Sequence, residues 1–388
     1  MKIIAIAACA AVTGCVLAQG GLGPLDPPAG PVLDTGPDLA ALARAVKTPI
    51  SGLPGAATAK HVITEPGAYV LDTDLIAIDG ESGIWIAAPG NVFIDLGGHT
   101  ISQAGTGHIE GFGGHGVHAE SDPELLILGD LNSYENAGDG FRVGEDVFGL
   151  YIAAVGNAGA GVRGGNDVVI KGSKIKENLT AALLLGSDAQ LFDNFVKGRV
   201  DGGVYMVGAR NTFVLNTDDG DWFLTNGMMT NLTHNRFTLK GDTPPTAPVI
   251  RLSGENLEFS SNHMNSAMAS AQSPGAQVFA EVGGDNSNVE GNTFQGLMAN
   301  QVGLALAGSG HIVHGNTFVA APVFSGAPIG VHLRPGANRI AIVGNTFKGF
   351  FVGSAVSNGT GNNNVLAPIV DASALPGNGN PDRNLVLP

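Results

Sequence analysis

The stretch Gly315-Asn316-Thr317-Phe318 decides the fold, because it recurs along the chain. The same four residues stand at 291–294 and 344–347. Looser copies are Asp193-Asn194-Phe195, Asn235-Arg236-Phe237 and Asn262-His263-Met264. From Asn235 onward, successive copies lie about 24 to 30 residues apart. This spacing is typical of solenoids, in which each repeat forms one turn of a stack.

A short strand that begins with Gly precedes the motif in each turn, as in Gly303-Leu304-Ala305-Leu306. Its alternation places apolar side chains inside the stack and the residues between them outside. Asn at a repeated turn tolerates a left-handed backbone and can hydrogen-bond to its copies in neighbouring turns. The pattern predicts an all-β, single-stranded right-handed parallel β-helix over residues 62–360, of about ten to twelve turns. Asn216-Thr217-Asp218 is expected to be a copy in which Asp replaces Phe.

The composition supports a packed repeat protein. Of 388 residues, 59 are Gly, 44% are hydrophobic and only 14% are charged, which excludes wholesale disorder. The formal net charge of −15 excludes a general nucleic-acid binder, whose surface would be basic. No transmembrane span is expected after the first segment, because no later run offers the ~20 apolar residues that such a helix needs.

Residues 1–18 resemble an export signal whose cleavage would free Gln19. Alternatively, 12–15 resemble a lipobox, which would make 1–14 the signal and Cys15 a lipid anchor. We therefore expect a secreted, periplasmic or cell-surface protein without disulfides. Residues 19–61 should form a Pro/Gly-rich leader and a short helix, 39–46, which begins at Asp38 and covers the open end of the stack. Residues 361–388 should form a C-terminal cap or tail.

The residues between the apolar positions of the Gly-led strands should form one outward-facing column, because turns stack about 4.8 Å apart. From the N-terminal end it is expected to contain Trp85, His118, Arg142, Arg163, Ala182, Tyr205, then Trp222 or Phe223, and Arg251, Ala280, Ala305 and His332. Aromatic and basic residues dominate this column, which we interpret as a polysaccharide-binding groove. The substrate-binding residues would be Trp85, His118, Tyr205 and Arg251. An outer ladder that binds no ligand is the alternative interpretation.

Arg142 and Arg163 would lie on adjacent turns, an arrangement that an anion stabilises. Such a pair can clamp a carboxylate or a sulfate group. Together with Lys171, these two residues are also candidates for the base of a lyase, which must stand beside a sugar proton. The alternative is a pair of solvated arginines that contact Glu145 or Asp167.

Three carboxylates lie within residues 218–221. Asp218 and Asp219 could act as general acid and base in glycoside hydrolysis. Alternatively, Asp218, Asp219 and Asp221 could hold Ca²⁺, which prefers oxygen ligands. The remaining interpretation is an acidic, solvated turn.

Several segments resemble right-handed parallel β-helix proteins of the pectate lyase-like superfamily, in particular exported bacterial repeat proteins. They are 23–28 (GPLDPP), 47–50 (KTPI), 63–71 (ITEPGAYVL) and 95–101 (DLGGHTI). The resemblance implies the fold, and it implies Ca²⁺ as the cofactor of a lyase. Asn216-Thr217-Asp218 and Gly114-His115-Gly116 are similar to polygalacturonase motifs, but here the His motif comes first and the Arg-x-Lys motif is missing.

The sequence thus predicts an exported β-helix protein that binds a polysaccharide, acidic in the first interpretation, and cleaves it if it is a lyase or hydrolase. The alternative is a non-catalytic scaffold or adhesion protein of the cell envelope. An oligomeric state has no signature in the sequence.

Overall fold

The structure is a computed structural model that describes residues 39–78, 80–104, 115–119, 125–242, 247–266, 277–321 and 328–350, and the short stretches 352–358, 364–366, 369–371 and 384–387. The expected export segment 1–18, the alternative anchor Cys15 and the expected helix start Asp38 lie outside the described residues. So do the expected leader up to residue 38 and parts of the expected C-terminal tail.

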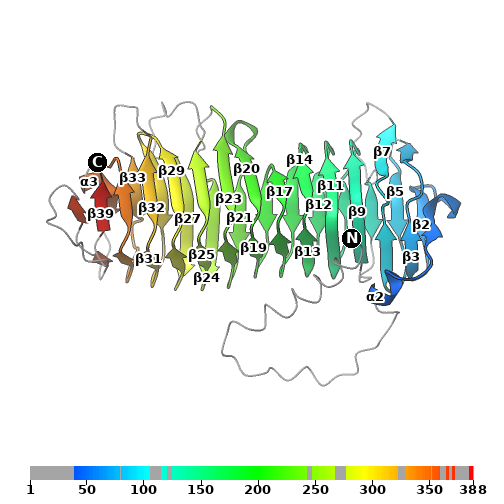
Figure 1. Cartoon of the computed structure of the whole chain (residues 1–388), viewed down its shortest axis with the longest axis horizontal. Helices are drawn as coiled ribbons and strands as arrows, with labels where there is room; N and C mark the ends of the chain where they lie inside the picture. The colour runs from blue at the N-terminus through cyan, green and yellow to red at the C-terminus, as the bar shows by residue number, and fades with distance from the viewer. Residues whose placement is uncertain are drawn as a thin grey trace, which may run out of the picture.

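The chain forms an all-β parallel solenoid of about eleven turns, as the sequence predicts. All pairings between named strands are parallel, and Figure 1 shows the turns stacked side by side along the long axis. Each turn contributes strands to three faces. Face 1 is a thirteen-stranded sheet of β2 (Ala59–Ile63), β5 (Ser82–Ile86), β8 (Val117–Ala119), β10 (Phe141–Arg142), β12 (Ala160–Gly164), β15 (Ala181–Leu185), β18 (Val200–Gly202), β21 (Phe223–Asn226), β24 (Ile250–Glu255), β27 (Gln277–Asp285), β30 (Gln301–Leu306), β33 (Ile329–Leu333) and β36 (Val356–Asn358).

The other two faces belong to one 26-stranded sheet, because β9 (Leu125–Tyr134) and β11 (Val147–Val155) continue through both. Face 2 also contains β1 (Thr48–Pro49), β3 (Gly67–Val70), β6 (Val92–Asp95), β13 (Val168–Lys171), β16 (Gln190–Phe192), β19 (Val207–Ala209), β22 (Asn231–Thr233), β25 (Glu258–Ser260), β28 (Asn288–Glu290), β31 (Ile312–His314), β34 (Ala341–Val343) and β37 (Val365–Leu366). Face 3 also contains β4 (Leu75–Ile78), β7 (Thr100–Ala104), β14 (Lys174–Lys176), β17 (Phe195–Lys197), β20 (Thr212–Asn216), β23 (Arg236–Lys240), β26 (His263–Ser266), β29 (Thr293–Leu297), β32 (Thr317–Ala320), β35 (Thr346–Lys348), β38 (Ile369–Asp371) and β39 (Asn384–Leu387).

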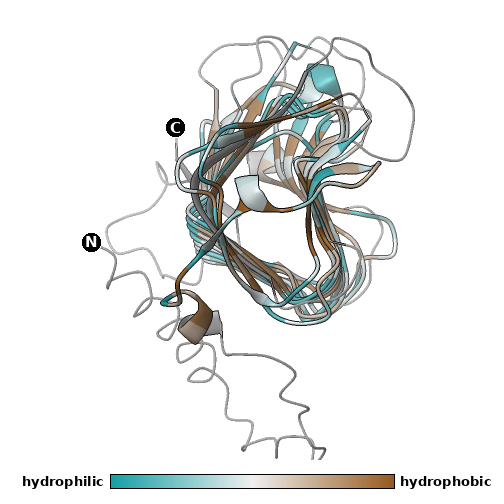
Figure 2. Ribbon diagram, turned by 90° about the vertical axis from the view of Figure 1, so that its right-hand side faces the viewer, coloured by the Kyte–Doolittle hydropathy of each residue, from teal (hydrophilic) through white to brown (hydrophobic). Residues whose placement is uncertain are grey.

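One hydrophobic core fills the space that the three faces enclose, and successive turns lie behind one another around it (Figure 2). The Phe residues of the repeated motif stack along this core. The rings of Phe294 and Phe318 are 4.7 Å apart and those of Phe318 and Phe347 are 5.0 Å apart, at interplanar angles of 10° and 7°. Ring stacking at this spacing adds to the apolar area that each turn buries.

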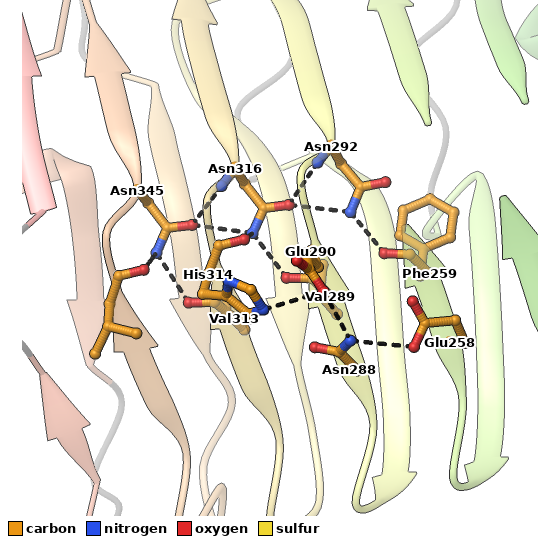
Figure 3. Close-up of polar contacts among 11 residues, drawn as sticks. Glu258, Phe259, Asn288, Val289, Glu290, Asn292, Val313, His314, Asn316 and Asn345 are labelled. Carbon is orange, nitrogen blue, oxygen red and sulfur yellow. Dashed lines mark hydrogen bonds and ion pairs between the residues drawn. The ribbon is translucent and has the colours of Figure 1, made fainter. Parts of the chain in front are cut away.

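A ladder of Asn side chains runs through the corner between faces 2 and 3. In Figure 3, Nδ2 of Asn292 donates to Oδ1 of Asn316 at 3.0 Å, and Nδ2 of Asn316 donates to Oδ1 of Asn345 at 2.9 Å. Each side chain is buried, and the backbone N–H of each also donates to the next Oδ1. The predicted hydrogen bonding between stacked copies is therefore confirmed. The ladder begins at Asn194 and continues through Asn211, Asn235, Asn262, Asn292, Asn316 and Asn345.

The ladder corrects the predicted register in two turns. The motif in the first is Asn194-Phe195-Val196, because Val196 lies in the core while Phe195 is exposed. In the second it is Asn211-Thr212-Phe213 rather than Asn216-Thr217-Asp218, which lies one corner further along the chain.

The left-handed backbone conformation lies one residue before each ladder Asn, not at the Asn itself. The residues with this conformation are Asp193, Arg210, His234, Ser261, Gly291, Gly315 and Gly344, with φ between 55° and 66°. Gly fits this conformation best, which explains why Gly precedes Asn-Thr-Phe in the three full copies.

The expected helix 39–46 is reduced to a single turn, α2 (Leu39–Leu42), and it does not cover the open end. Leu42 packs against Ala68 and Phe93, a small cluster apart from the central core. Instead, the 3₁₀ turn η1 (Ile50–Gly52) between β1 and β2 places Ile50 in the core at this end. A one-turn helix, α3 (Val352–Ala355), contributes Ala355 to the core near the other end. Within the described residues, no helix is long and apolar enough to cross a membrane.

Candidate functional site

The strand register of face 1 brings most of the predicted outer column together. Trp85 pairs with His118, His118 with Arg142, and Arg142 with Arg163 on successive strands. Further along the same column lie Arg251, Ala305 and His332.

Four expected members of the column are wrong. The register places Leu184, Asp201, Leu224 and Glu281 where Ala182, Tyr205, Trp222 or Phe223, and Ala280 were expected. Ala182, Phe223 and Ala280 belong to the core. Tyr205 lies beyond the end of β18, at a corner with φ of 59°. No Gly stands two positions before Leu184, Asp201, Leu224 or Glu281, so the Gly-led pattern did not locate these residues.

Arg163 is not free to clamp an anionic ligand together with Arg142. Its Nε donates to Oδ2 of Asp139 at 2.9 Å, and the Asp139 side chain is only 4% exposed. Asp139 also accepts the backbone N–H of Ala160 at 2.7 Å. The partner of Arg163 is therefore Asp139, not Glu145 or Asp167, and the pair is a buried carboxylate compensated by a half-exposed guanidinium.

The three carboxylates of residues 218–221 do not share one set of partners, because Asp218 lies apart from Asp219 and Asp221. Asp218 accepts the backbone N–H of Asp242 at 3.0 Å, while Asp219 and Asp221 accept the side-chain amide and the backbone N–H of Asn216. Within the described residues, no group of three or more His, Cys, Asp or Glu side chains is arranged to hold a metal ion. In the structure, Asp218, Asp219 and Asp221 are therefore not arranged as the expected Ca²⁺ site.

Two of these carboxylates instead line a hollow, here called the corner groove, at the corner between faces 3 and 1. Its volume is about 820 Å³, within the range of ligand pockets. Four successive turns line it with residues 156–158, 177–181, 197–199 and 219–222. Asp219, Asp221 and Trp222 belong to it, and Asp218 does not.

Trp222 is the aromatic residue of the corner groove, and polar contacts fix its ring. Its Nε1 donates to Oδ1 of Asp201 at 2.6 Å. The guanidinium of Arg199 lies over the ring at 4.2 Å from the centroid, and Arg199 Nε donates to Asp201 at 2.9 Å. Arg251, a predicted substrate-binding residue, approaches the same ring at 5.8 Å. The indole is therefore held in one orientation before any ligand arrives.

The charges of the corner groove are unevenly compensated. Lys197 lies 3.8 Å from Glu177, which also pairs with Lys176, and Arg199 pairs with Asp201. Asp219 and Asp221 form no ion pair within the described residues. Burial raises the pKa of Asp221 above the usual range of an aspartic acid, and the nearby charge of Asp219 raises it further. The groove thus carries one compensated acid, Glu177, and two uncompensated ones.

Sequence reasoning considered Trp222 only for the column and missed Arg199 and Asp201. A signal was available, because Arg199-x-Asp201 and Asp221-Trp222 lie about one repeat apart and so stack on adjacent turns. It could not be recognised without the correct register of these two turns.

The comparisons with known proteins identify no family for this chain. No family model matches the chain, and no curated protein matches it in sequence. The resemblance to the pectate lyase-like superfamily therefore rests on the sequence segments alone.

Solved structures with a similar chain course include DFA-IIIase from Arthrobacter chlorophenolicus A6 in complex with GF2, at 16% identity, a TM-score of 0.41 and coverage of 76% of this chain and 69% of that one. The same enzyme without its lid matches at 16% identity, a TM-score of 0.39 and coverage of 75% and 68%. The catalytic unit of the GH87 α-1,3-glucanase from Streptomyces thermodiastaticus strain HF3-3 matches at 12% identity, a TM-score of 0.37 and coverage of 89% and 68%. Likenesses at this level concern the fold and assign no role to any residue.

Proposed function

We propose that the protein binds a neutral oligosaccharide or polysaccharide in the corner groove. The observation that carries this proposal is the fixed indole of Trp222 at the edge of a hollow that carboxylates and basic groups also line. An aromatic ring provides a flat apolar surface for the C–H face of a sugar. The carboxylates and ammonium groups around it offer hydrogen bonds to sugar hydroxyls.

The charges of the groove favour a neutral sugar over an acidic one. Its cations already have carboxylate partners, so they attract an additional anion weakly. A uronate group would instead meet Asp219 and Asp221, which have no cationic partner in the described part of the chain. The acidic polysaccharide of the sequence-based interpretation is therefore replaced by a neutral one.

The shape of the groove favours a chain over a single sugar. Four stacked turns contribute to it, and turns stack about 4.8 Å apart, so it extends over about 15 Å. That length accommodates more than one sugar unit along the axis of the solenoid.

Hydrolysis is a second candidate function, and the raised pKa of Asp221 favours it. A carboxyl group whose pKa is raised is a better proton donor to a glycosidic oxygen than an ordinary aspartic acid. Asp219, which also lines the groove, would be the second carboxylate that such a reaction needs. Of the expected catalytic residues, Asp219 remains in this proposal, while Asp218, Arg142 and Arg163 lie outside the groove.

The experiment is affinity electrophoresis of the purified protein through gels that contain neutral or uronate-rich polysaccharides, with reducing ends measured in parallel. We expect retardation by at least one neutral polysaccharide and by no uronate-rich one. New reducing ends that vanish in Asp221→Asn would establish hydrolysis. If no polysaccharide changes the migration of the protein, the proposal is contradicted and the non-catalytic scaffold of the cell envelope is favoured.

A further inference from the structure

A buried histidine on the outer side of face 1 holds its ring in one tautomer. His115, whose side chain is 7% exposed, accepts the backbone N–H of Asp139 at Nδ1 over 2.8 Å. A nitrogen that accepts a hydrogen bond carries no proton, so in the neutral ring the proton is on Nε2. Burial lowers the pKa of His115 to about 4, so the ring is neutral near pH 7.

The Nε2–H of His115 faces a second donor. Nη1 of Arg142 lies 3.5 Å from Nε2, and a guanidinium has only donors. Two donors at this distance do not bond to each other, but both can donate to an acceptor placed between or above them. The other tautomer does not resolve the conflict, because Nδ1–H would then oppose the Asp139 N–H at 2.8 Å.

The positive charge of Arg142 is not compensated by the neighbouring carboxylate. Asp139 Oδ2 is already engaged by Arg163 at 2.9 Å, and Oδ1 accepts Ala160 N–H. Arg142 forms no ion pair within the residues that the structure describes. It also pairs in register with Arg163 on the next strand, so two arginines lie side by side and only Arg163 contacts the carboxylate of Asp139.

We propose that Arg142 and His115 form a binding site for a small oxyanion, whose oxygens accept from Nη1 of Arg142 and from Nε2–H of His115. An oxyanion at this point satisfies both donors and compensates the charge of Arg142. The site lies outside the residues that line the corner groove. It therefore does not depend on the proposed binding of a neutral sugar.

The test is equilibrium dialysis of the full chain against radiolabelled acetate and, separately, radiolabelled sulfate, near pH 7 and at an ionic strength held constant with sodium chloride. The variants are Arg142→Gln and, as a matched control, Arg210→Gln. Arg210 is an exposed arginine that pairs with Asp193 at 2.7 Å, so its removal changes the net charge by the same amount. Circular dichroism melting verifies that both variants fold.

We expect one saturable site per chain for at least one of the two anions, with affinity at least tenfold weaker in Arg142→Gln and unchanged in Arg210→Gln. Binding of acetate would indicate a site for a planar carboxylate, and binding of sulfate would indicate a site for a tetrahedral oxyanion. Absence of saturable binding in both arms, or equal weakening in the two variants, would overturn the proposal.

Discussion

At the scale of single residues, the corner groove depends on contacts that fix one side chain. Trp222 donates to Asp201 and is covered on one side by Arg199, which also bonds to Asp201. A side chain already held in one rotamer loses little conformational entropy when a ligand packs on it. In the proposed function, the Arg199–Asp201 pair thus contributes to sugar binding by fixing the orientation of the indole.

Replacing Trp222 with Ala should weaken binding of the neutral polysaccharide at least tenfold, because the apolar surface beneath the sugar is lost. A tenfold change corresponds to about 1.4 kcal/mol. Trp222→Phe should retain part of the affinity. Retardation in affinity gels measures both, and equal affinities of the wild type and Trp222→Ala would refute a role for the indole.

The protonation of His115 should make stability depend on pH. Its pKa is lowered to about 4 in the folded state by burial, and by the charges of His118, Arg142 and Arg163 against the opposing effect of Asp139. The unfolded chain binds a proton near pH 6.5, so the free energy of unfolding falls as the pH decreases from about 6.5 to about 4. The loss amounts to about 3 kcal/mol at most.

Urea unfolding of the wild type and of His115→Gln between pH 4 and pH 7.5 measures this contribution. The slope of the unfolding free energy with pH is the relevant quantity, because His115→Gln also alters packing. His311 and His332, whose pKa values are lowered mainly by burial, contribute with the same sign in both proteins. Identical slopes would show that His115 titrates normally.

At the scale of structural elements, the Asn ladder ties each turn to the next. Asn262 accepts from the backbone and side chain of Asn235 and donates to Leu232 O and to Asn292. It therefore satisfies buried groups in its own and in neighbouring turns. One turn of the solenoid cannot shift relative to its neighbours without breaking several of these hydrogen bonds.

Replacing Asn262 with Ala should lower the free energy of unfolding by about 3 kcal/mol or more, because buried partners on neighbouring turns lose their bonds. Asn288→Ala is the matched control, since the side-chain amide of Asn288 donates to the side chains of Glu258 and Glu290 on the outer surface (Figure 3) and not to another turn's buried backbone. We expect that control to change stability by less than about 1 kcal/mol. Similar losses in the two variants, measured by urea unfolding, would contradict the importance of the ladder.

The sequence predicted the outer residues of some strands of face 1 and missed those of others. The Gly-Asn-Thr-Phe copies predicted the stacking of Asn and Phe. The Gly-led strands predicted the outer residues from Trp85 to Arg163, because each of these residues stands two positions after a Gly. The prediction failed at Asp201 and Leu224, because no Gly stands two positions before either residue. The corner groove depends on the turns of these two residues, so it could not be found before their register was known.

At the scale of the whole molecule, the net charge of −15 acts on any ligand that approaches. Repulsion by the summed field opposes an acidic polysaccharide and leaves a neutral one unaffected. Salt screens such repulsion within about 10 Å at 0.1 M.

Affinity for the neutral polysaccharide should therefore change less than about twofold between 0.02 and 0.5 M sodium chloride, since its binding does not rest on charge. Affinity gels cast at the two salt concentrations measure this. A tenfold loss of affinity at the higher salt concentration would instead indicate an ionic ligand and contradict the neutral assignment.

Fluorescence can detect the proposed contact between a sugar and Trp222, because the chain contains only two Trp residues, at 85 and 222. In Trp85→Phe, the indole fluorescence therefore reports on Trp222 alone. Titration of that variant with oligosaccharides of the polysaccharide that retards the protein should give a saturable change in intensity or wavelength, and uronate oligosaccharides should give none. A protein that the polysaccharide still retards, but whose Trp222 fluorescence stays constant through saturation, would place the binding site elsewhere.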